Sequence, residues 1–558
     1  MRFRIYSFSC LLAYSVGNAA GQDAHFGQQR GSWLGWGANI FNNRLAAPGS
    51  PINSCNAAFL IETCSKIYST GVSATPVVQK NIVYYPTWSG LYVALDYTTC
   101  KEIWTVNVTA FTLANGGPPP FNFSFIASLS RTSAVLDGDV VYFGTQAHAL
   151  LVAVDRHTGN VLDHIQINSH PYALLTQSPT LWNGILYIGS SSAEESAAAY
   201  IPDYHCCSFI GNFAAVEFDQ RSHKFKVLWQ QTMAPISSNF TGLGIWGGQP
   251  SIDPRRHQVF IATGNIYFLP ESASKCENET QNNPGLKHDP CVPSNVYAEA
   301  VLALDLTSGH VNWATALGPL DAYTSACRTG REPSNCPPSP GPDADFGMAP
   351  SFVLGGKGTP QGKDTVVVGQ KNGNLYAFDA KSGALFWVNP TSPDGVVGGL
   401  IWGLAVDGTA VYYTAVNFGQ VPFRLMGASA NITNSAFGAA NLADGKSLWQ
   451  TAVTPANGYS QSVPSVVNDV VFNGRSGVFS AKPGGNPSEP GELVAIDKRT
   501  GTILHDYPLD HIFYANIAIL DKYLMFGTGY LGLSENGTFQ VWQLRESEKS
   551  SNCRKRRR

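Results

Sequence analysis

Two adjacent cysteines, Cys206 and Cys207, are the residues of this chain whose spacing most directly suggests chemistry. Adjacent cysteines in a secreted protein are uncommon unless they bond to each other, and such a bond closes a small, strained ring that is usually retained for function. A flat redox cofactor lying against a disulfide is the chemistry that this pair indicates. The alternative is that each cysteine pairs elsewhere in the chain.

Carboxylates of two acidic pairs could hold a hard cation or accept a proton: Glu194, which precedes Glu195, and Asp343 or Asp345. Ca²⁺ prefers carboxylate and amide oxygens, and a positioned carboxylate can serve as a general base. Each pair also has an ordinary interpretation, because isolated acidic residues usually lie in solvated loops. A common function therefore requires that they converge on one point with other polar residues.

The first residues of the chain predict secretion. Residues 1–4 are basic, an apolar run follows, and small residues end at Ala20, so residues 1–20 are expected to be a cleavable signal peptide. No later segment has the ~20 apolar residues of a membrane-spanning helix. Six Asn-X-Ser/Thr sequons suit a glycosylated secreted protein. They start at Asn107, Asn122, Asn239, Asn278, Asn431 and Asn536.

The remaining cysteines suit an oxidising compartment, because three pairs are close enough in sequence to close short loops. These pairs are Cys55 with Cys64, Cys276 with Cys291, and Cys327 with Cys336, whereas Cys100 and Cys553 have no obvious partner. A net charge of −3 with 13% charged residues gives no basic surface for nucleic acid. The basic residues near the end predict a disordered tail over residues 546–558.

One short phrase, Ala-x-Asp-x-x-Thr-Gly-x-x-x-Trp, recurs seven times with variations. The copies begin at Ala94, Ala153, Ala215, Ala303, Ala377, Ala439 and Ala495. Each copy predicts an alternating strand, a hairpin turn with a capping Asp and a left-handed Gly, and a second strand that carries a large indole. Copies that begin several tens of residues apart, as these do, are typical of four-stranded propeller blades.

Seven copies and one terminal blade predict an all-β protein, an eight-bladed β-propeller of four-stranded antiparallel blades. The terminal blade is expected to combine strands near residues 523–526 and 539–542 with an N-terminal strand near residues 33–36. Closing the ring with both ends of the chain leaves no exposed sheet edge. Residues 30–545 are therefore expected to form a single domain.

The repeat resembles the tryptophan-docking motif of the pyrroloquinoline quinone (PQQ) alcohol dehydrogenases, over nearly the whole chain that follows the signal peptide. The resemblance is closest to the branch of the polyvinyl alcohol dehydrogenases. It is carried by nine segments between the repeats, at residues 130–133, 169–171, 176–179, 191–195, 206–209, 245–248, 263–265, 343–347 and 369–373. The resemblance implies an enzyme with PQQ and a metal ion.

The same resemblance implies roles for individual residues. Cys206 and Cys207 match the disulfide that lies against one face of the quinone, and Trp246 matches the indole on the other face. Three further residues match those that bind the carboxylates and carbonyl oxygens of the quinone: Arg131, Thr176 and Lys371. The metal ligands implied are Glu194, Asn265 and Asp345.

An aspartate of the Asp343-Ala344-Asp345 segment matches the catalytic base. The Phe-Gly that follows favours Asp345, whereas the metal-proximal Asp-x-Asp pattern favours Asp343, and both assignments stay open. PQQ would accept the hydride equivalent, while a hard cation would polarise its carbonyl. Ca²⁺ is the expected ion, and a lanthanide is the alternative if both aspartates approach it.

The sequence thus predicts a secreted dehydrogenase that oxidises a small or polymeric alcohol or polyol to a carbonyl compound. No Cys-x-x-Cys-His motif for a covalent haem occurs, so an external acceptor, a cytochrome or a quinone, is expected to take the electrons. The alternative is a non-catalytic propeller that serves as a binding or scaffold module. A sugar-directed dehydrogenase would share the site and differ in the loops.

Overall fold

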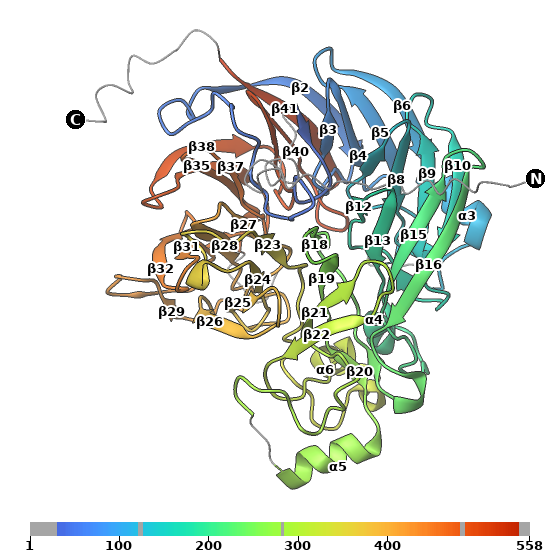
Figure 1. Cartoon of the computed structure of the whole chain (residues 1–558). Coiled ribbons are helices and arrows are strands. Elements are labelled where there is room, and N and C mark those ends of the chain that lie inside the picture. Colours follow the sequence, from blue (N-terminus) through green and yellow to red (C-terminus); the bar gives the residue numbers. More distant parts are fainter. Residues whose placement is uncertain (1–30, 121–125, 281–283, 480–485, 546–558) are drawn as a thin grey trace, which may run out of the picture.

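Eight antiparallel sheets surround a common axis in the computed structural model, like the blades of a propeller (Figure 1). The structure describes residues 31–120, 126–280, 284–479 and 486–545. The eight-bladed β-propeller predicted from the repeats is confirmed. The predicted signal peptide, the predicted C-terminal tail, Asn122 and Cys553 lie outside the described residues.

The first four blades follow each other along the chain. Blade 1 contains β1 (Ser32–Trp33), β3 (Val77–Gln79), β4 (Ile82–Pro86), β5 (Leu91–Asp96) and β6 (Lys101–Asn107). Blade 2 contains β7 (Val135–Asp137), β8 (Val140–Gly144), β9 (Leu150–Asp155) and β10 (Val161–Gln166). Blade 3 contains β12 (Thr180–Trp182), β13 (Ile185–Gly189), β15 (Asn212–Asp219) and β16 (Lys224–Thr232). Blade 4 contains β18 (Ser251–Asp253), β19 (Gln258–Ala262), β21 (Ala300–Asp305) and β22 (Val311–Ala316).

The last four blades complete the ring. Blade 5 contains β23 (Ser351–Val353), β24 (Thr365–Gly369), β25 (Asn374–Asp379) and β26 (Leu385–Pro390). Blade 6 contains β27 (Ala405–Val406), β28 (Ala410–Ala415), β31 (Ala436–Asn441) and β32 (Ser447–Ala452). Blade 7 contains β34 (Ser465–Val467), β35 (Val470–Arg475), β37 (Gly491–Asp497) and β38 (Ile503–Leu509). Blade 8 contains β39 (Ala518–Leu520), β40 (Tyr523–Gly527), β41 (Asn536–Leu544) and β2 (Leu60–Ser69).

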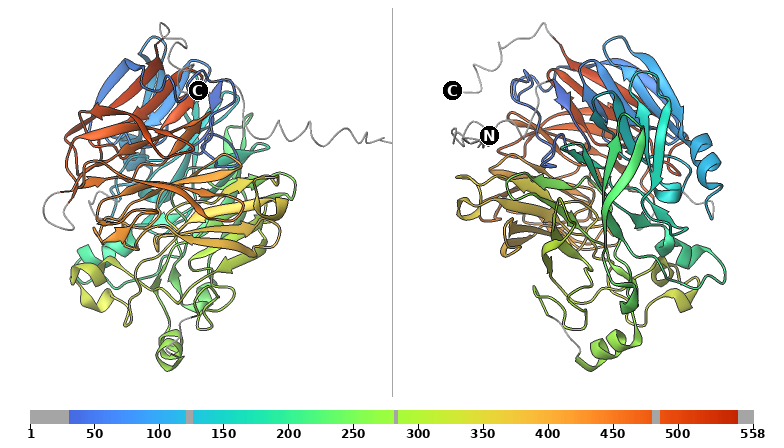
Figure 2. Two further views of the ribbon diagram at one scale, coloured as in Figure 1. Left: turned by 90° about the vertical axis from the view of Figure 1, so that its left-hand side faces the viewer. Right: turned by 45° about the vertical axis from the view of Figure 1, so that its right-hand side comes forward.

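Short helices and strand pairs occupy the loops between blades. The strand pairs are β11 (Ala173–Leu174) with β14 (Ser191–Ser192), β17 (Thr241–Gly242) with β20 (Ile266–Phe268), β29 (Phe423–Arg424) with β30 (Asn431–Ile432), and β33 (Gly458–Tyr459) with β36 (Gly477–Val478). The α-helices are α3 (Val108–Gly116), α4 (Glu194–Tyr200), α5 (Glu271–Thr280) and α6 (Ser325–Thr329). Single 3₁₀ turns are η1 (Ala147–Ala149), η2 (Ile236–Ser238), η3 (Pro333–Asn335) and η4 (Pro360–Gly362). Helix α5 projects away from the ring (Figure 1, Figure 2). None of the helices in the described ranges is long and apolar enough to cross a membrane.

The repeated turn docks most blades on the one before it. In blade 6 the Asn441 carbonyl accepts the N–H of Gly445, which has a φ of +73°. The indole of Trp387 from blade 5 packs against Gly445 and donates its Nε1–H to the Leu442 carbonyl at 2.9 Å. A Cβ at residue 445 would lie 2.5 Å from this indole, so both the backbone and the contact require glycine.

The ring is closed by a different strand from the one predicted. Strands β40 and β41 form blade 8 as expected, but β41 pairs with β2 over residues 60–69. The tryptophan-containing strand near residue 33 instead adds β1 to blade 1, where it pairs with β3. Both N-terminal segments can form strands, and only β2 is long enough to match the length of β41.

The segment after β1 runs along the inner strands at the centre of the ring. Main-chain hydrogen bonds join its residues 40–46 to the inner strands of blades 4 to 7. The fully buried guanidinium of Arg44 donates to the carbonyls of Trp36, Pro464 and Ile517, at 2.6, 2.9 and 3.1 Å. This segment therefore closes the axis on one side, and the site described below lies on the other side of Trp36.

Three disulfides outside the vicinal pair are present in the described residues. Cys276–Cys291 and Cys327–Cys336 close the loops expected from their spacing. The predicted pairing of Cys55 with Cys64 is wrong, because Cys64 of β2 is bonded to Cys100 in the turn after β5. Cys55 is disulfide-bonded as well. Sequence spacing did not predict the partner of Cys64, because β2, which carries Cys64, belongs to blade 8.

Candidate active site

A cavity of about 550 Å³ is surrounded by loops from blades 2 to 8. Because these loops come from successive blades, the cavity lies over the axis of the ring. Six of the ten residues selected from the sequence line it: Arg131, Thr176, Trp246, Asp343, Asp345 and Lys371. The other four, Glu194, Cys206, Cys207 and Asn265, are not among its lining residues.

A buried lysine organises the acidic part of this cavity. The Lys371 Nζ lies 3.1 Å from each carboxylate oxygen of Asp343 and 2.5 Å from Asp345 Oδ1. The Nε1–H of Trp246 donates to Asp345 Oδ2 at 2.7 Å, and the Lys371 Nζ lies 5.3 Å from the centre of the Trp246 ring. Blades 4 and 5 thus bring the two predicted bases, the predicted quinone-stacking indole and the predicted quinone-binding lysine together.

Glu195 joins the same group from the other side. It lines the cavity, and Ser325 Oγ donates to its Oε1 at 3.4 Å. Burial raises the pKa of Glu195 to about 7, although the charge of Lys371 opposes this shift. Burial also raises the pKa of Asp343 well above its usual range, with Lys371 opposing and the charges of Asp345 and Glu195 adding to the rise. Burial alone would lower the pKa of Lys371, but the surrounding carboxylates raise it.

A second buried carboxylate holds the Asp343 segment in place. Asp321 accepts the N–H of Ala344 at 2.6 Å and the N–H of Asp343 at 3.4 Å, while Asp343 adopts a left-handed φ of +63°. Burial and the neighbouring charge of Asp321 raise the pKa of Glu299 well above its usual range. Burial therefore favours the neutral form of Glu299, whose side chain is hydrogen-bonded to Asp321.

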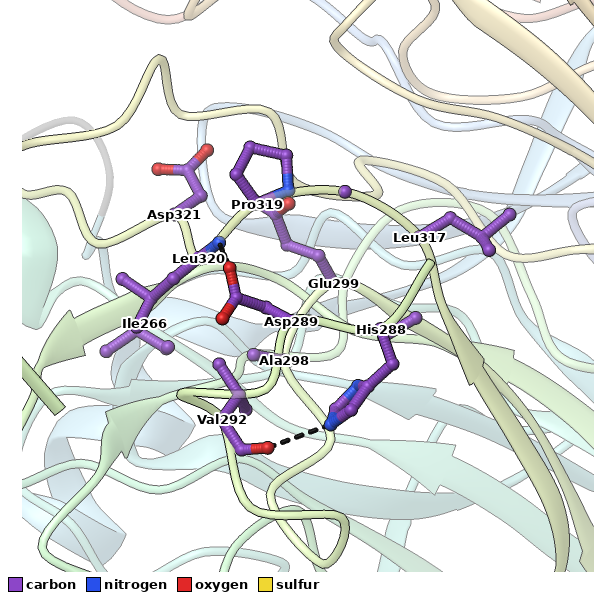
Figure 3. A pocket seen from close by; sticks show the side chains of 12 residues that line it. Ile266, His288, Asp289, Val292, Ala298, Glu299, Leu317, Pro319, Leu320 and Asp321 are labelled. Atoms are coloured by element: carbon purple, nitrogen blue, oxygen red, sulfur yellow. Dashed lines mark hydrogen bonds between the residues drawn. The ribbon is translucent and has the colours of Figure 1, made fainter. Parts of the chain in front are cut away.

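Figure 3 shows where Glu299 and Asp321 lie, around a small cavity of about 20 Å³ that also contacts Asp289. Asp289 Oδ2 accepts the N–H of Leu320 at 2.9 Å, and its Oδ1 accepts the N–H of Cys291 at 2.8 Å. These bonds attach the loop before Asp321 to the Cys276–Cys291 loop. The small cavity thus belongs to the support of the Asp343 segment.

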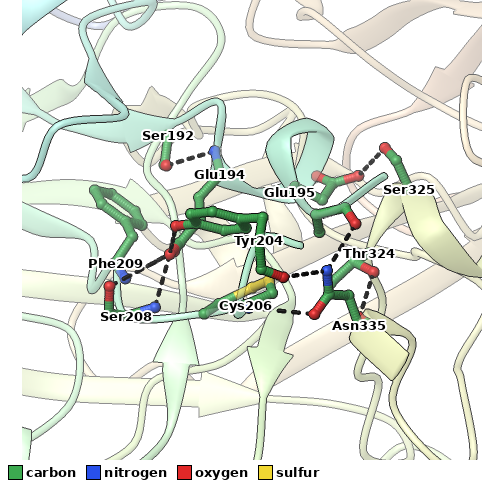
Figure 4. The surroundings of a disulfide bond; sticks show 12 residues. Ser192, Glu194, Glu195, Tyr204, Cys206, Ser208, Phe209, Thr324, Ser325 and Asn335 are labelled. Carbon is green, nitrogen blue, oxygen red and sulfur yellow. Dashed lines mark hydrogen bonds between the residues drawn. A yellow bond between two sulfur atoms is a disulfide. The ribbon is translucent and has the colours of Figure 1, made fainter. Parts of the chain in front are cut away.

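Glu194 and Glu195 point in different directions from the start of α4 (Figure 4). The fully buried Glu194 carboxylate accepts hydrogen bonds from Tyr204 Oη at 2.6 Å and from the N–H groups of Ser208 and Phe209, both at 2.8 Å. Its partners therefore belong to the segment around the adjacent cysteines. The neighbouring Glu195, one residue further along α4, lines the cavity, whereas Glu194 does not.

The vicinal disulfide is present: Cys206 and Cys207 are bonded, and the peptide between them is cis. The Cys206 N–H donates to Asn335 Oδ1 at 3.2 Å (Figure 4). Asn335 in turn donates to the carbonyls of Ala198 and Tyr204, at 2.9 and 2.7 Å. The disulfide is thus joined through Asn335 to α4 and to the Cys327–Cys336 loop, rather than exposed to the cavity.

Of two other predicted residues, Arg131 lines the cavity and Asn265 does not. The Arg131 guanidinium lies between two indoles, 4.7 Å from the Trp402 ring and 5.6 Å from the Trp88 ring. The Asn265 amide donates to the Tyr323 carbonyl at 3.0 Å, next to the Asp321 segment. Arg131 is therefore available to an anion in the cavity, whereas Asn265 does not line the cavity and its amide nitrogen donates to main-chain carbonyls.

Sequence reasoning missed four residues of the site. Glu195 and Arg328 line the cavity, while Asp321 and Asn335 position the segments around it. Adjacency to Glu194 was a signal for Glu195, since neighbouring helical residues face different sides. The other three lie in loops without a repeated phrase, so their types alone gave no indication.

The donor set fits the cofactor and the ion that the sequence predicts. Three carboxyl groups surround one ammonium group, and together they supply oxygen ligands of the kind that a hard cation prefers. Ligand sites usually measure ~300–1,000 Å³, a range that includes this cavity. Arg131, Arg328 and the indole of Trp246 suit a flat, anionic quinone.

Comparison with known proteins finds two polyvinylalcohol dehydrogenases among the relatives of this chain. A polyvinylalcohol dehydrogenase of Pseudomonas sp is 28% identical over 393 residues, which are 68% of this chain and 54% of that protein. A polyvinylalcohol dehydrogenase of Sphingopyxis sp. (strain 113P3) is 31% identical over 276 residues, which are 47% of this chain and 37% of that protein. The predicted resemblance to the quinoprotein alcohol dehydrogenases is confirmed. The chain spans about half or less of the length of these relatives.

The solved structures share the fold over almost the whole chain. The quinohemoprotein alcohol dehydrogenase of Comamonas testosteroni has a TM-score of 0.63 and 15% identity, with 96% of this chain and 84% of that chain covered. A europium-containing methanol dehydrogenase has a TM-score of 0.64 and 14% identity, with coverage of 94% and 100%. The family model described as outer membrane protein assembly factor BamB matches residues 298–517, which include the strands of blades 5 to 7.

Proposed function

We propose that this protein is a PQQ-dependent dehydrogenase that oxidises an alcohol or polyol to a carbonyl compound. The observation that carries the proposal is the convergence of Glu195, Asp343, Asp345 and Lys371 beneath Trp246 in one central cavity. Its polyvinylalcohol dehydrogenase relatives support the same reaction class.

In this proposal Glu195 takes the metal-binding role that the sequence suggested for Glu194. Asp343 or Asp345 provides a further ligand, and Ca²⁺ or a lanthanide is the ion, because all of these donors are oxygens. Asn265 does not line the cavity and supports the Asp321 segment. Cys206 and Cys207 stabilise α4 through Asn335 rather than lie against the quinone.

Each residue of the cluster has a proposed part in the reaction. When bound, PQQ would supply the hydride acceptor and the ion a Lewis acid. Asp345 removes the hydroxyl proton of the alcohol, since Trp246 fixes its Oδ2 beside the space for the cofactor. Lys371 stabilises negative charge that develops on an oxygen next to it. Arg131, Thr176 and Trp246 hold and orient the cofactor.

The location and the electron acceptor are also proposals. All five sequons in the described ranges have exposed asparagines, as glycosylation of a secreted protein requires. They are Asn107, Asn239, Asn278, Asn431 and Asn536. With no covalent haem motif in the sequence, an external cytochrome or quinone would receive the electrons.

A calorimetric titration of the purified protein with PQQ, with and without Ca²⁺, tests the proposal directly. We expect stoichiometric binding that requires Ca²⁺, followed by reduction of an artificial dye with one member of an alcohol panel. Asp345→Asn should retain PQQ and lose turnover by at least ~100-fold, the usual contribution of a general base. Asp444→Asn, an exposed turn residue, is the control. A protein that binds no PQQ is instead the non-catalytic propeller.

A further inference from the structure

The two halves of the central cavity differ in chemistry. All six charged side chains that line it precede residue 396: Arg131, Glu195, Arg328, Asp343, Asp345 and Lys371. From residue 396 onward the lining is largely apolar and aromatic, with no charged side chain: Val396, Val397, Ile401, Trp402, Phe418, Gln461, Asn486, Pro487, Tyr514, Tyr530, Leu531, Gly532 and Leu533. We call the later set the apolar wall.

Three polar side chains of the apolar wall, Trp402, Gln461 and Tyr514, are hydrogen-bonded within the protein. The Gln461 amide oxygen accepts the Nε1–H of Trp402 at 3.2 Å, and its amide nitrogen is bonded to the Tyr459 hydroxyl. Tyr514 is hydrogen-bonded to the same Tyr459. A hydroxyl-rich ligand placed here would lose hydrogen bonds to water without replacing them, whereas a hydrocarbon group would lose nothing.

Aromatic neighbours hold the apolar wall in a fixed shape. The Tyr514 ring lies 4.9 Å from the Tyr530 ring, which lies 4.8 Å from the ring of Trp88. Phe418 packs 5.6 Å from Tyr459, measured between ring centres. Leu531 and Leu533 stand at the edge of the cavity and remain half-buried, so their apolar surface is incompletely covered by the protein.

We infer that the apolar wall binds the carbon skeleton of the substrate, and that the substrate is an alcohol with an apolar group of several carbons rather than a sugar or a short polyol. This inference rests on the proposed function. The charged half holds the cofactor, the ion and the reacting hydroxyl group. The wall faces that half across one continuous cavity, so it removes the remainder of the alcohol from water.

Substitution of the leucines at the cavity edge tests the inference. Saturation-transfer NMR on the protein without added cofactor should detect 1-hexanol and benzyl alcohol, and glycerol only weakly. After reconstitution with PQQ and Ca²⁺, Leu531→Asn with Leu533→Asn should lower the hexanol-to-glycerol ratio of kcat/KM by about tenfold or more. The affinity for PQQ should not change. Leu448→Asn, an exposed leucine of β32, is the matched control.

The outcomes separate this inference from the proposed function. Glycerol or a sugar that binds and reacts as well as hexanol, or an unchanged ratio in the double variant, would overturn the apolar wall as the substrate site. Failure to bind PQQ would overturn the proposed function. In that case an NMR signal from hexanol that disappears in the double variant would still establish an apolar ligand site. Val397→Thr, a change of similar volume, repeats the test on the opposite loop.

Discussion

Five blade interfaces use an indole where the interface that closes the ring uses a disulfide. At the five, a tryptophan donates to a carbonyl in the turn of the next blade at 2.8–3.1 Å; the residues are Trp104, Trp229, Trp313, Trp387 and Trp449. Between blades 8 and 1, Cys64 and Cys100 form a covalent bond instead. The two devices join equivalent elements, namely an outer strand and the turn of the following blade.

The strand registers show that the positions correspond. In blade 1 the register shifts so that Trp104 faces Ala94 while Glu102 faces Leu95. In blade 8 the same shift places Cys64 opposite Val541 and Glu62 opposite Trp542. Cys100 stands where other turns have glycine and adopts a positive φ of 57°. At the interface between blades 8 and 1, the disulfide therefore replaces the tryptophan contact of the other interfaces.

There is a physical reason for a covalent bond, the Cys64–Cys100 disulfide, at the interface that closes the ring. Blade 8 is the sheet in which strands from the two ends of the chain meet, so its outer strand β2 has no hairpin that ties it to β41. The chain entropy that opposes this pairing is larger than for a hairpin. A disulfide from β2 to blade 1 limits the open states of the ring and so favours closure.

The largest loss of stability is expected when a tryptophan at one of these blade interfaces is replaced. Trp387→Ala should lower the free energy of unfolding by about 4 kcal/mol, because it leaves a cavity between blades 5 and 6 and removes the bond to the Leu442 carbonyl. Denaturant unfolding followed by fluorescence measures the loss. Trp387→Phe keeps most of the packing, so it should cost about 1 kcal/mol. Equal losses in both variants would contradict a packing role.

Breaking the ring closure should have the next largest effect. Cys64→Ser with Cys100→Ser removes a link between residues 36 apart in sequence and should lower stability by about 3 kcal/mol. Cys64→Trp with Cys100→Gly would install the docking pair of the other interfaces, and we expect it to restore part of this stability. If the second double variant is less stable than the first, the positions are not equivalent.

Substitution at the interface between blades 2 and 3 should cause the smallest loss of stability. Here Asp163 stands opposite Ala153, where other blades have tryptophan, and accepts hydrogen bonds from the Phe225 N–H at 2.9 Å and the Lys224 Nζ at 3.1 Å. Burial opposes the shift, but these two donors lower the pKa of Asp163 below its usual 3.8. Asp163→Asn should cost about 1 kcal/mol at neutral pH.

The pH dependence of this contribution has a definite sign. Because the pKa of Asp163 is lower in the folded protein, the stabilisation is complete above pH 3.8 and is lost as the pH falls through the lower folded-state pKa. Unfolding midpoints of the wild type and of Asp163→Asn should therefore converge in acid. The exposed Asp394→Asn is the control. A difference that persists unchanged at the lowest pH would argue against an ionic contribution.

Prediction from sequence succeeded where local patterns recur. It failed where a segment could pair with more than one distant part of the chain. The turn that begins at Asp155 was predictable, since its Oδ1 accepts the N–H groups of His157 and Thr158 within the same turn. The partner of Cys64 was not predictable, because it depends on which blade β2 joins. Six of the selected residues line the cavity because the loops that carry them follow predictable strands.

By itself, the sequence determined the repeat, the eight blades and the residue types of the proposed quinone and metal site. Each of these depends on contacts within about one hairpin or on chemistry that a side chain carries anywhere. Only the tertiary structure directed Glu194 to the main chain of the cysteine segment and Glu195 to the cavity, through the direction that α4 gives each side chain. It also directed Cys206 and Cys207 to Asn335 instead of the cavity. Such choices depend on how α4 and α6 pack over the ring, and no local pattern encodes that packing.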